Sequence, residues 1–238
     1  FGSAAGATNF TANLEGNFST ANSAANIYAN MNFTKAGDQT LTYSAGNIYA
    51  NGWTQAKPSG QVNLATNFTF TTFTVANDNY LKIYDPAGTR TVTYTTFTHT
   101  GGTFNFEAPY PATVIGAYTQ SGGTFNAPAN LTVTGSFIRS GGTFNAPSGT
   151  LTFNPSSTAT ITLTGGGFNA NNGTIVFTVA SNTNFTAGGA ILNHVAFTHT
   201  AGTTTFTFKD NVTINGNVTC SESTGNIFYI YATSTPTP

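Results

Sequence analysis

The chain has 238 residues, of which 6 are basic and 7 acidic, so that only 5% are charged and the formal net charge is −1. Nucleic-acid binding depends on clustered Lys and Arg side chains, and the few basic residues here are scattered, so the composition argues against a nucleic-acid partner. No run of about 18 apolar residues occurs, and the sequence therefore predicts no membrane span.

Residues 1–96 contain alternating strands and a repeated phrase. Asn-Ile-Tyr-Ala-Asn occurs at 26–30 and again at 47–51, an offset of 21 residues. A period near 20 residues is typical of solenoids, because each coil buries its apolar row only by stacking on its neighbours. We therefore expect the solenoid to begin near the N-terminus, although an antiparallel β-sandwich remains the alternative for this irregular part.

The clearest repeat follows, with Gly-Gly-Thr-Phe-Asn occurring three times. It places Phe104, Phe125 and Phe144 at offsets of 21 (104 to 125) and 19 (125 to 144), and a weaker copy places Phe168 a further 24 residues on. Between these phrases lie strands with alternating apolar residues and turns rich in Gly, Ala and Pro. We expect the four rings to form one interior stack, and the Asn that follows each ring to form a second row at a corner.

The last predicted strand, 226–231, is apolar on both of its alternating faces. Ile227, Tyr229 and Tyr231 share one face, and Phe228 and Ile230 share the other. Such a strand requires burial on both sides. It is either the last buried strand of its own domain or a candidate donor strand that completes the sheet of the next subunit. The N-terminal segment from Phe1 is the other candidate for this donor role.

These elements predict an all-β chain, chiefly a right-handed parallel β-solenoid (a β-helix) with coils of about 20 residues. We divide it into an N-terminal β region, 1–96, and solenoid repeats with the C-terminal strand, 97–233. Residues 234–238, Ser-Thr-Pro-Thr-Pro, form an extended tail.

Residues able to support catalysis or metal binding are sparse. The seven carboxylates are mostly isolated, and the sequence lacks the acidic cluster that a solenoid glycosidase or lyase needs. His99 and His199 follow the same Phe-Thr-His-Thr phrase, and we place them at equivalent positions about five coils apart, too far to share a metal. We therefore predict no catalytic residues, no metal site and no cofactor.

Asn-x-Ser/Thr sequons are frequent, as expected for a chain rich in Asn and Thr. They are candidate glycosylation sites if the chain is secreted from a cell that glycosylates. Two sequons, Asn67 and Asn130, begin predicted strands, where attachment is geometrically awkward. The seven remaining candidates are Asn9, Asn17, Asn32, Asn172, Asn184, Asn211 and Asn217.

The phrase Ser-Gly-Gly-Thr-Phe-Asn-Ala-Pro, followed by Leu-Thr-Val-Thr or Thr-Leu-Thr-Phe, resembles repeats of prokaryotic surface proteins with parallel β-helix folds. The resemblance is to the filamentous-haemagglutinin or autotransporter-adhesin class, and it covers residues 97–180 best. It implies an extracellular or cell-surface location and a role in adhesion or envelope structure.

From these features we expect a structural subunit of an extracellular filament, pilus-like fibre or sheath, not an enzyme, that assembles by strand-mediated head-to-tail contacts. A solenoid has an unpaired strand edge at each end, and this chain has almost no charge with which to block association there. The partners are then copies of the same chain and, for an adhesive role, surface glycans. The alternative is a monomeric adhesin, or a module that binds glycans or ice through a flat and unbroken face of Thr side chains.

Overall fold

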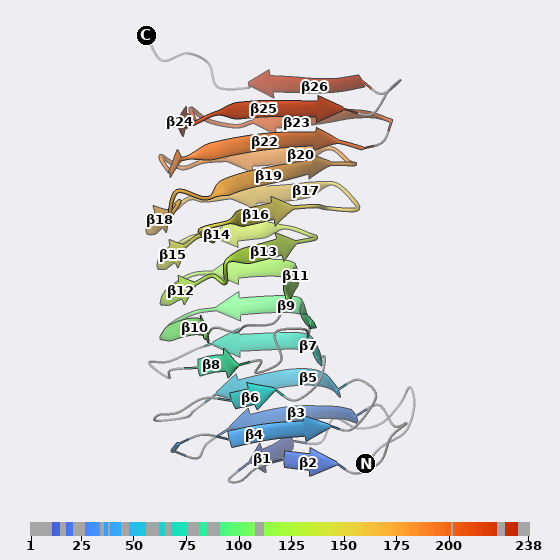
Figure 1. Cartoon of the computed structure of the whole chain (residues 1–238), viewed down its shortest axis with the longest axis vertical. Helices are drawn as coiled ribbons and strands as arrows, with labels where there is room; N and C mark the ends of the chain where they lie inside the picture. Colours follow the sequence, from blue (N-terminus) through green and yellow to red (C-terminus); the bar gives the residue numbers. More distant parts are fainter. Residues whose placement is uncertain are drawn as a thin grey trace.

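The protein is described by a computed structural model, shown in Figure 1. The residues that it describes are 11–14, 18–20, 27–33, 36–37, 39–43, 48–55, 62–64, 68–75, 81–84, 91–107, 112–200, 202–222 and 227–232. In this part the chain is an all-β parallel solenoid with coils of about 22 residues and no helix. The predicted fold class is confirmed, and the coils are slightly longer than expected.

Two long parallel ladders and one short one make up the solenoid. The main path of the 16-stranded sheet is β1 (Thr11–Leu14), β3 (Ile27–Phe33), β5 (Ile48–Gln55), β7 (Phe68–Val75), β9 (Thr91–His99), β11 (Ala112–Gln120), β13 (Asn130–Val133), β16 (Thr150–Phe153), β19 (Thr174–Val179), β22 (His194–His199) and β25 (Val218–Glu222). Its branch is β14 (Phe137–Arg139), β17 (Ala159–Thr162), β20 (Thr183–Thr186), β23 (Thr203–Phe208) and β26 (Ile227–Ala232). The second sheet is β2 (Phe18–Thr20), β4 (Gln39–Tyr43), β6 (Val62–Leu64), β8 (Leu81–Tyr84), β10 (Thr103–Glu107), β12 (Thr124–Asn126), β15 (Thr143–Asn145) and β18 (Gly167–Asn169). A third sheet pairs β21 (Ile191–Leu192) with β24 (Thr213–Ile214).

The N-terminal strands belong to the same ladders as the rest. β1, β3, β5, β7 and β9 pair in order, and every one of these pairs is parallel. The antiparallel sandwich considered for residues 1–96 is therefore not the arrangement of the described strands there. The expected boundary at residue 97 falls inside β9, which pairs with β7 and β11 along its length. The division into residues 1–96 and residues 97–233 as two units stays a prediction.

The main sheet divides after β11. The first half of β11 pairs with β13 and the second half with β14, so that the coils from residue 130 to residue 214 have three strands where earlier coils have two. The chain bends between β13 and β14 at Gly135, where a Cβ atom would lie 2.5 Å from the carbonyl oxygen of Gly116 in the coil below. Only glycine permits so close a stacking of the two bends.

This division corrects the predicted equivalence of the two histidines. His99 is aligned through Gln120 with Arg139 of β14, on the branch. His199 lies in β22, on the main path, opposite Val179. Although β9 and β22 are both on the main path, the shared phrase Phe-Thr-His-Thr therefore occupies two different register positions, because the local alternation of a strand does not reveal its register with strands in distant coils.

The interior is filled mainly by rows of aromatic rings. Phe97, Tyr118 and Phe137 stack with ring centroids 5.4 and 4.6 Å apart, and all three are almost completely buried. Burying each such ring contributes roughly 1.5–3 kcal/mol. Because a row gains this energy only between successive coils, the stability of the solenoid resides in coil-to-coil contact.

Candidate functional site

The repeated Gly-Gly-Thr-Phe-Asn phrase forms one corner of each central coil. Its rings lie in register in the second sheet, with centroid distances of 5.4 Å from Phe104 to Phe125, 5.0 Å from Phe125 to Phe144 and 5.9 Å from Phe144 to Phe168. The first three rings are fully buried. Phe168 is only half-buried. The four rings thus form the interior stack that the spacing predicts, with an incompletely covered last member.

The Asn after each ring forms the second row at this corner. The side-chain amide of Asn126 donates to Asn105, that of Asn145 to Asn126, and that of Asn169 to Asn145. Each amide both donates and accepts, so that one residue type extends the ladder indefinitely. This row fixes the register of the coils and needs no ligand.

A buried polar column lies inside the same corner, and the sequence analysis missed it. His99, Gln120 and Arg139 are aligned on successive coils, and each is fully buried. Their side chains bond carbonyl oxygens of the Gly-Gly turns: His99 to Gly102 at 3.2 Å, Gln120 to Gly122, Gly123 and Thr143 at 3.0–3.3 Å, and Arg139 to Gly142 and Gly167 at 3.1 and 2.8 Å. The sequence does contain a pattern that predicts this column, because each of the three polar residues is two positions after a buried ring and therefore on the inward face of its strand.

Arg139 carries a charge into this core. Its Nε donates to the side-chain oxygen of Gln120 at 2.9 Å, and its guanidinium lies 5.8 Å from the ring centroid of Phe144 and 6.0 Å from that of Phe168. Burial lowers the pKa of Arg139, and the neighbouring Tyr118 acts in the opposite direction. Carbonyl dipoles and ring faces thus replace water around the cation. The column stabilises the corner and does not face solvent.

The described carboxylates do not converge on a reaction centre. Asp210 accepts the backbone N–H groups of Ala187 and Gly188 at 2.7 and 2.6 Å, which is a structural bond between neighbouring coils. Glu222 lies exposed on β25. Within the described residues no group of three His, Cys, Asp or Glu side chains is placed to hold a metal ion. Glu15, Asp38, Asp78 and Asp85 lie outside the described residues.

The candidate glycosylation sites are spread along the solenoid. Asn172, Asn211 and Asn217 are exposed, and Asn184 is half-buried within β20. Asn32 is in β3, where only the backbone is described. Asn9 and Asn17 lie outside the described residues. Glycosylation at any of these positions stays a prediction.

The outward Thr rows are interrupted. On the main path Thr132 and Thr152 are followed by Val176 and Ala196 in successive coils. On the branch Ile138 lies between Thr119 and the next Thr. The flat and unbroken Thr face expected of an ice-binding module is therefore not formed on these two ladders.

The last coil is more exposed than the coil on which it stacks. The strand considered as a donor is β26, which pairs in parallel with β23 of its own chain (Figure 1). Its inward-facing residues continue the interior rows, since Phe206 is opposite Ile230 and Thr204 is opposite Phe228. Phe206 is fully buried, whereas Ile230 remains 47% exposed.

The second strand of this coil repeats the pattern. In β25, Val218 follows the buried Val195 and Cys220 follows the buried Phe197, yet Val218 and Cys220 are exposed. Among the side chains that the structure describes, seven large hydrophobic ones are exposed, and all but Ile138 and Ile191 lie on β25 and β26, namely Val218, Ile227, Tyr229, Ile230 and Tyr231. We call β25 and β26 together the terminal coil. The expected burial on both faces is thus not provided by the described chain.

Fold and site together define a parallel β-solenoid whose described end exposes its interior rows. No family model, no curated protein and no solved structure matches this chain. Among the described residues there is no helix that is long and apolar enough to cross a membrane.

Proposed function

We propose that the chain is a structural subunit of an extracellular filament or sheath, in which the terminal coil of one copy stacks on the first coil of the next. The supporting observation is the terminal coil itself, where interior-row residues such as Val218 and Ile230 stay about half exposed. Covering an apolar surface with a matching coil is favourable at roughly 25 cal/mol per Å².

The topology supports head-to-tail contact. The paths of the two large sheets begin at β1 and β2, and the main sheet ends at β25 and, on its branch, β26, with all ladders parallel. A copy stacked coaxially therefore meets the terminal coil with strands of the same direction. Such a contact joins two different surfaces and does not close, so that it extends as a filament.

The two described strands of the terminal coil have few of the residues with which proteins block strand edges. Its two strands contain a single charged side chain, Glu222, and no proline. Natural edges are usually protected by charge, proline or a covering segment. Tyr229 and Tyr231 stack 5.9 Å apart on the outward face and add area for a neighbouring copy.

The resemblance of the repeated phrase to repeats of prokaryotic surface adhesins supports an extracellular or cell-surface location and leaves room for an adhesive role of the assembled fibre. A surface poor in charge and rich in Thr, Asn and Gly fits a structural rather than a catalytic subunit. Immunogold labelling of intact source cells tests the location, since an external fibre is labelled without permeabilisation.

Assembly is tested by electron microscopy and sedimentation of the purified protein over a wide concentration range, with a matched pair of variants. Ile230→Lys places a charge in the terminal coil, and Ile138→Lys places one at a similarly exposed position, 42% against 47%, on the side of the solenoid. We expect filaments from the parent and from Ile138→Lys, and monomers from Ile230→Lys. A parent that stays monomeric at all concentrations contradicts the proposal, as does an Ile230→Lys variant that still polymerises.

A further inference from the structure

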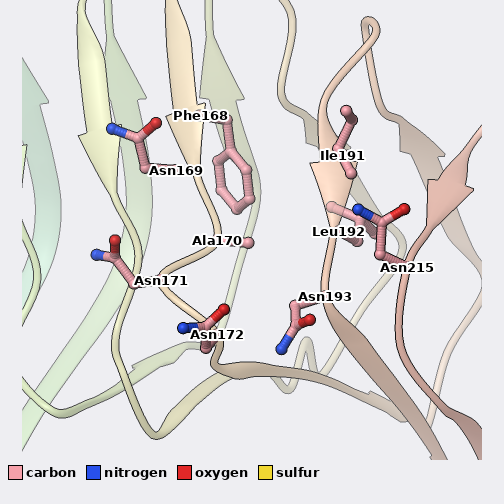
Figure 2. Close-up of a pocket in the computed structure, with 9 residues that line it drawn as sticks. All are labelled: Phe168, Asn169, Ala170, Asn171, Asn172, Ile191, Leu192, Asn193 and Asn215. Atoms are coloured by element: carbon pink, nitrogen blue, oxygen red, sulfur yellow. The ribbon is translucent and has the colours of Figure 1, made fainter.

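A second feature of the solenoid is a break in the corner ladder after β18. The second sheet ends at β18, and the next coil contributes β21 to a separate sheet with β24. On the main path the same coils remain paired through β19 and β22. The break is therefore confined to one corner, and a groove of about 460 Å³ opens there between neighbouring coils (Figure 2).

The backbone explains why the ladder breaks. Asn171 and Asn172 follow β18 with φ of 49° and 58°, both in the left-handed region. Two such non-glycine residues in succession turn the chain sharply. In the following coil Ile191 is 53% exposed while its neighbour Leu192 is buried. This coil supplies no fifth ring, so that Phe168, the last of the stack, is left half-buried beside the groove.

The break also interrupts the Asn row. Successive members of the row end at Asn169, and 24 residues on (169 + 24) the corresponding residue is Asn193. The row then continues in the next coil at Asn215, since Leu192 is in register with Ile214 and the backbone N–H of Asn215 donates to Leu192. Asn169 is thus on one side of the groove and Asn193 and Asn215 are on the other (Figure 2).

The lining has a consistent chemistry. Asparagine side chains supply the polar groups, and Phe168, Ile191 and Leu192 supply the apolar ones. The side-chain N–H groups of Asn169 and Asn171 donate away from the groove, to Asn145 and to the carbonyl of Ala146, so that Asn169 offers the groove its acceptor oxygen. An adjoining hollow of about 230 Å³, which shares Phe168 and Ile191, is lined otherwise by Leu163, Gly166, Gly188, Gly189 and Ala190. None of these side chains is ionisable. The groove therefore favours a neutral ligand.

We propose that this groove binds a neutral oligosaccharide. Sugar hydroxyls both donate and accept hydrogen bonds, as side-chain amides do, and hydroxyls placed between Asn169 and Asn193 would bridge the interrupted row. The apolar C–H faces of a sugar ring pack against the exposed side of Phe168 and against Ile191. A total volume of several hundred Å³ is within the usual range for small-ligand sites.

The test uses full-length protein from a host without N-glycosylation, because Asn172 begins a sequon and an attached glycan would occupy the groove. An array of neutral oligosaccharides of glucose, galactose, mannose and N-acetylglucosamine, with acidic oligosaccharides and extended peptides beside them, identifies the binder. Calorimetric titration then measures its affinity.

We expect Asn193→Ala, Asn215→Ala and Ile191→Ala each to lower the affinity about tenfold, because each removes a hydrogen bond or an apolar contact. Asn154→Ala and Ile138→Ala are matched controls at exposed positions outside the groove and should bind as the parent does. The absence of binding to every neutral oligosaccharide at millimolar concentration overturns the proposal. So does a preference for acidic sugars or peptides, or an affinity that the groove variants leave unchanged.

The groove and the terminal coil are separate sites. The Ile230→Lys variant designed to prevent assembly should keep the parent's affinity for the sugar. Loss of filaments in that variant and loss of sugar binding in Asn193→Ala therefore report on two independent proposals.

Discussion

Phe206 of β23 and Ile230 of β26 occupy the same interior row in neighbouring coils, but the first is fully buried and the second is 47% exposed. The same contrast separates Val195 from Val218 on the other ladder. What distinguishes the central coils from the terminal coil is thus that a described coil lies above them, and not the character of their residues. In a solenoid the energy of a side chain depends on its neighbours along the axis.

The largest expected difference between the two regions is the effect of removing a ring. Phe144→Ala takes a fully buried ring from the corner stack and should lower the free energy of unfolding by about 3–5 kcal/mol. Tyr231→Ala removes a ring that is 51% exposed in the terminal coil and should cost less than about 1 kcal/mol in the monomer. Urea denaturation at low protein concentration measures both. Equal losses would contradict the comparison.

The Gly-Gly turn gives the next largest effect. Gly142 has φ of +73°, and a Cβ atom there would lie 2.6 Å from the carbonyl oxygens of Gly122 and Gly123. Gly142→Ala should therefore cost about 2–3 kcal/mol, from backbone strain and from displacement of the coil below. Gly202 has φ of +64° but no atom of the described residues within 4 Å of its Cβ position, and Gly202→Ala should lose only about 1 kcal/mol. If the two variants are equally unstable, close stacking of the turns contributes nothing.

The buried polar column of the central coils predicts a pH dependence of stability. Burial lowers the pKa of His99 from its ordinary value, and the hydrogen bond to the Gly102 carbonyl acts in the opposite direction. Below about pH 6.5 the unfolded chain therefore binds more protons at His99 than the folded chain does. The contribution of neutral His99 to the free energy of unfolding is complete above that pH and is lost as the pH falls. The slope should be at most about 1.4 kcal/mol per pH unit.

Unfolding curves from pH 7.5 to 5.5 measure this effect. His99→Gln introduces the residue that the next coil has at the same position, Gln120, and should remove the slope. A slope that persists unchanged in the variant assigns the pH dependence to another group.

The smallest predicted effect concerns a hydroxyl. Tyr118 is buried between Phe97 and Phe137, and its hydroxyl oxygen has no hydrogen-bond partner in the described structure. Burial raises its pKa well above the ordinary value, while Arg139 acts in the opposite direction. Tyr118→Phe should leave stability unchanged or raise it by about 1 kcal/mol, because it removes an unsatisfied polar group. A loss of more than 1 kcal/mol in urea denaturation would show that the hydroxyl has a partner.

Much of the corner could be predicted from the sequence, because a repeated phrase places equal residues in equal positions. Phe104, Phe125 and Phe144, with the Asn after each, fall in one stack for this reason. The division of the main sheet could not be predicted. It depends on how the bend at Gly135 stacks on Gly116, which is a contact between coils and not a local pattern.

The two candidate sites show the same limit. The apolar residues of β26 are visible in the sequence, but their pairing with β23 and their exposure follow from which coil lies next to them. The groove is even harder to predict from the sequence, because Asn193 has the spacing of the Asn row and yet lies across a break in the sheet from Asn169. Periodicity predicts positions along the axis, whereas left-handed residues such as Asn171 decide locally whether neighbours pair.

Hydrogen exchange on the intact protein tests the central proposal, that another copy of the chain covers the terminal coil. At low concentration the amides of β25 and β26 should exchange much faster than those of β13 and β16, which are paired on both sides. On concentration into filaments, the amides of β25 and β26 should become protected while those of β13 and β16 stay unchanged. Equal protection of the two regions in the dilute protein, or a terminal coil whose exchange does not slow on concentration, would contradict the account.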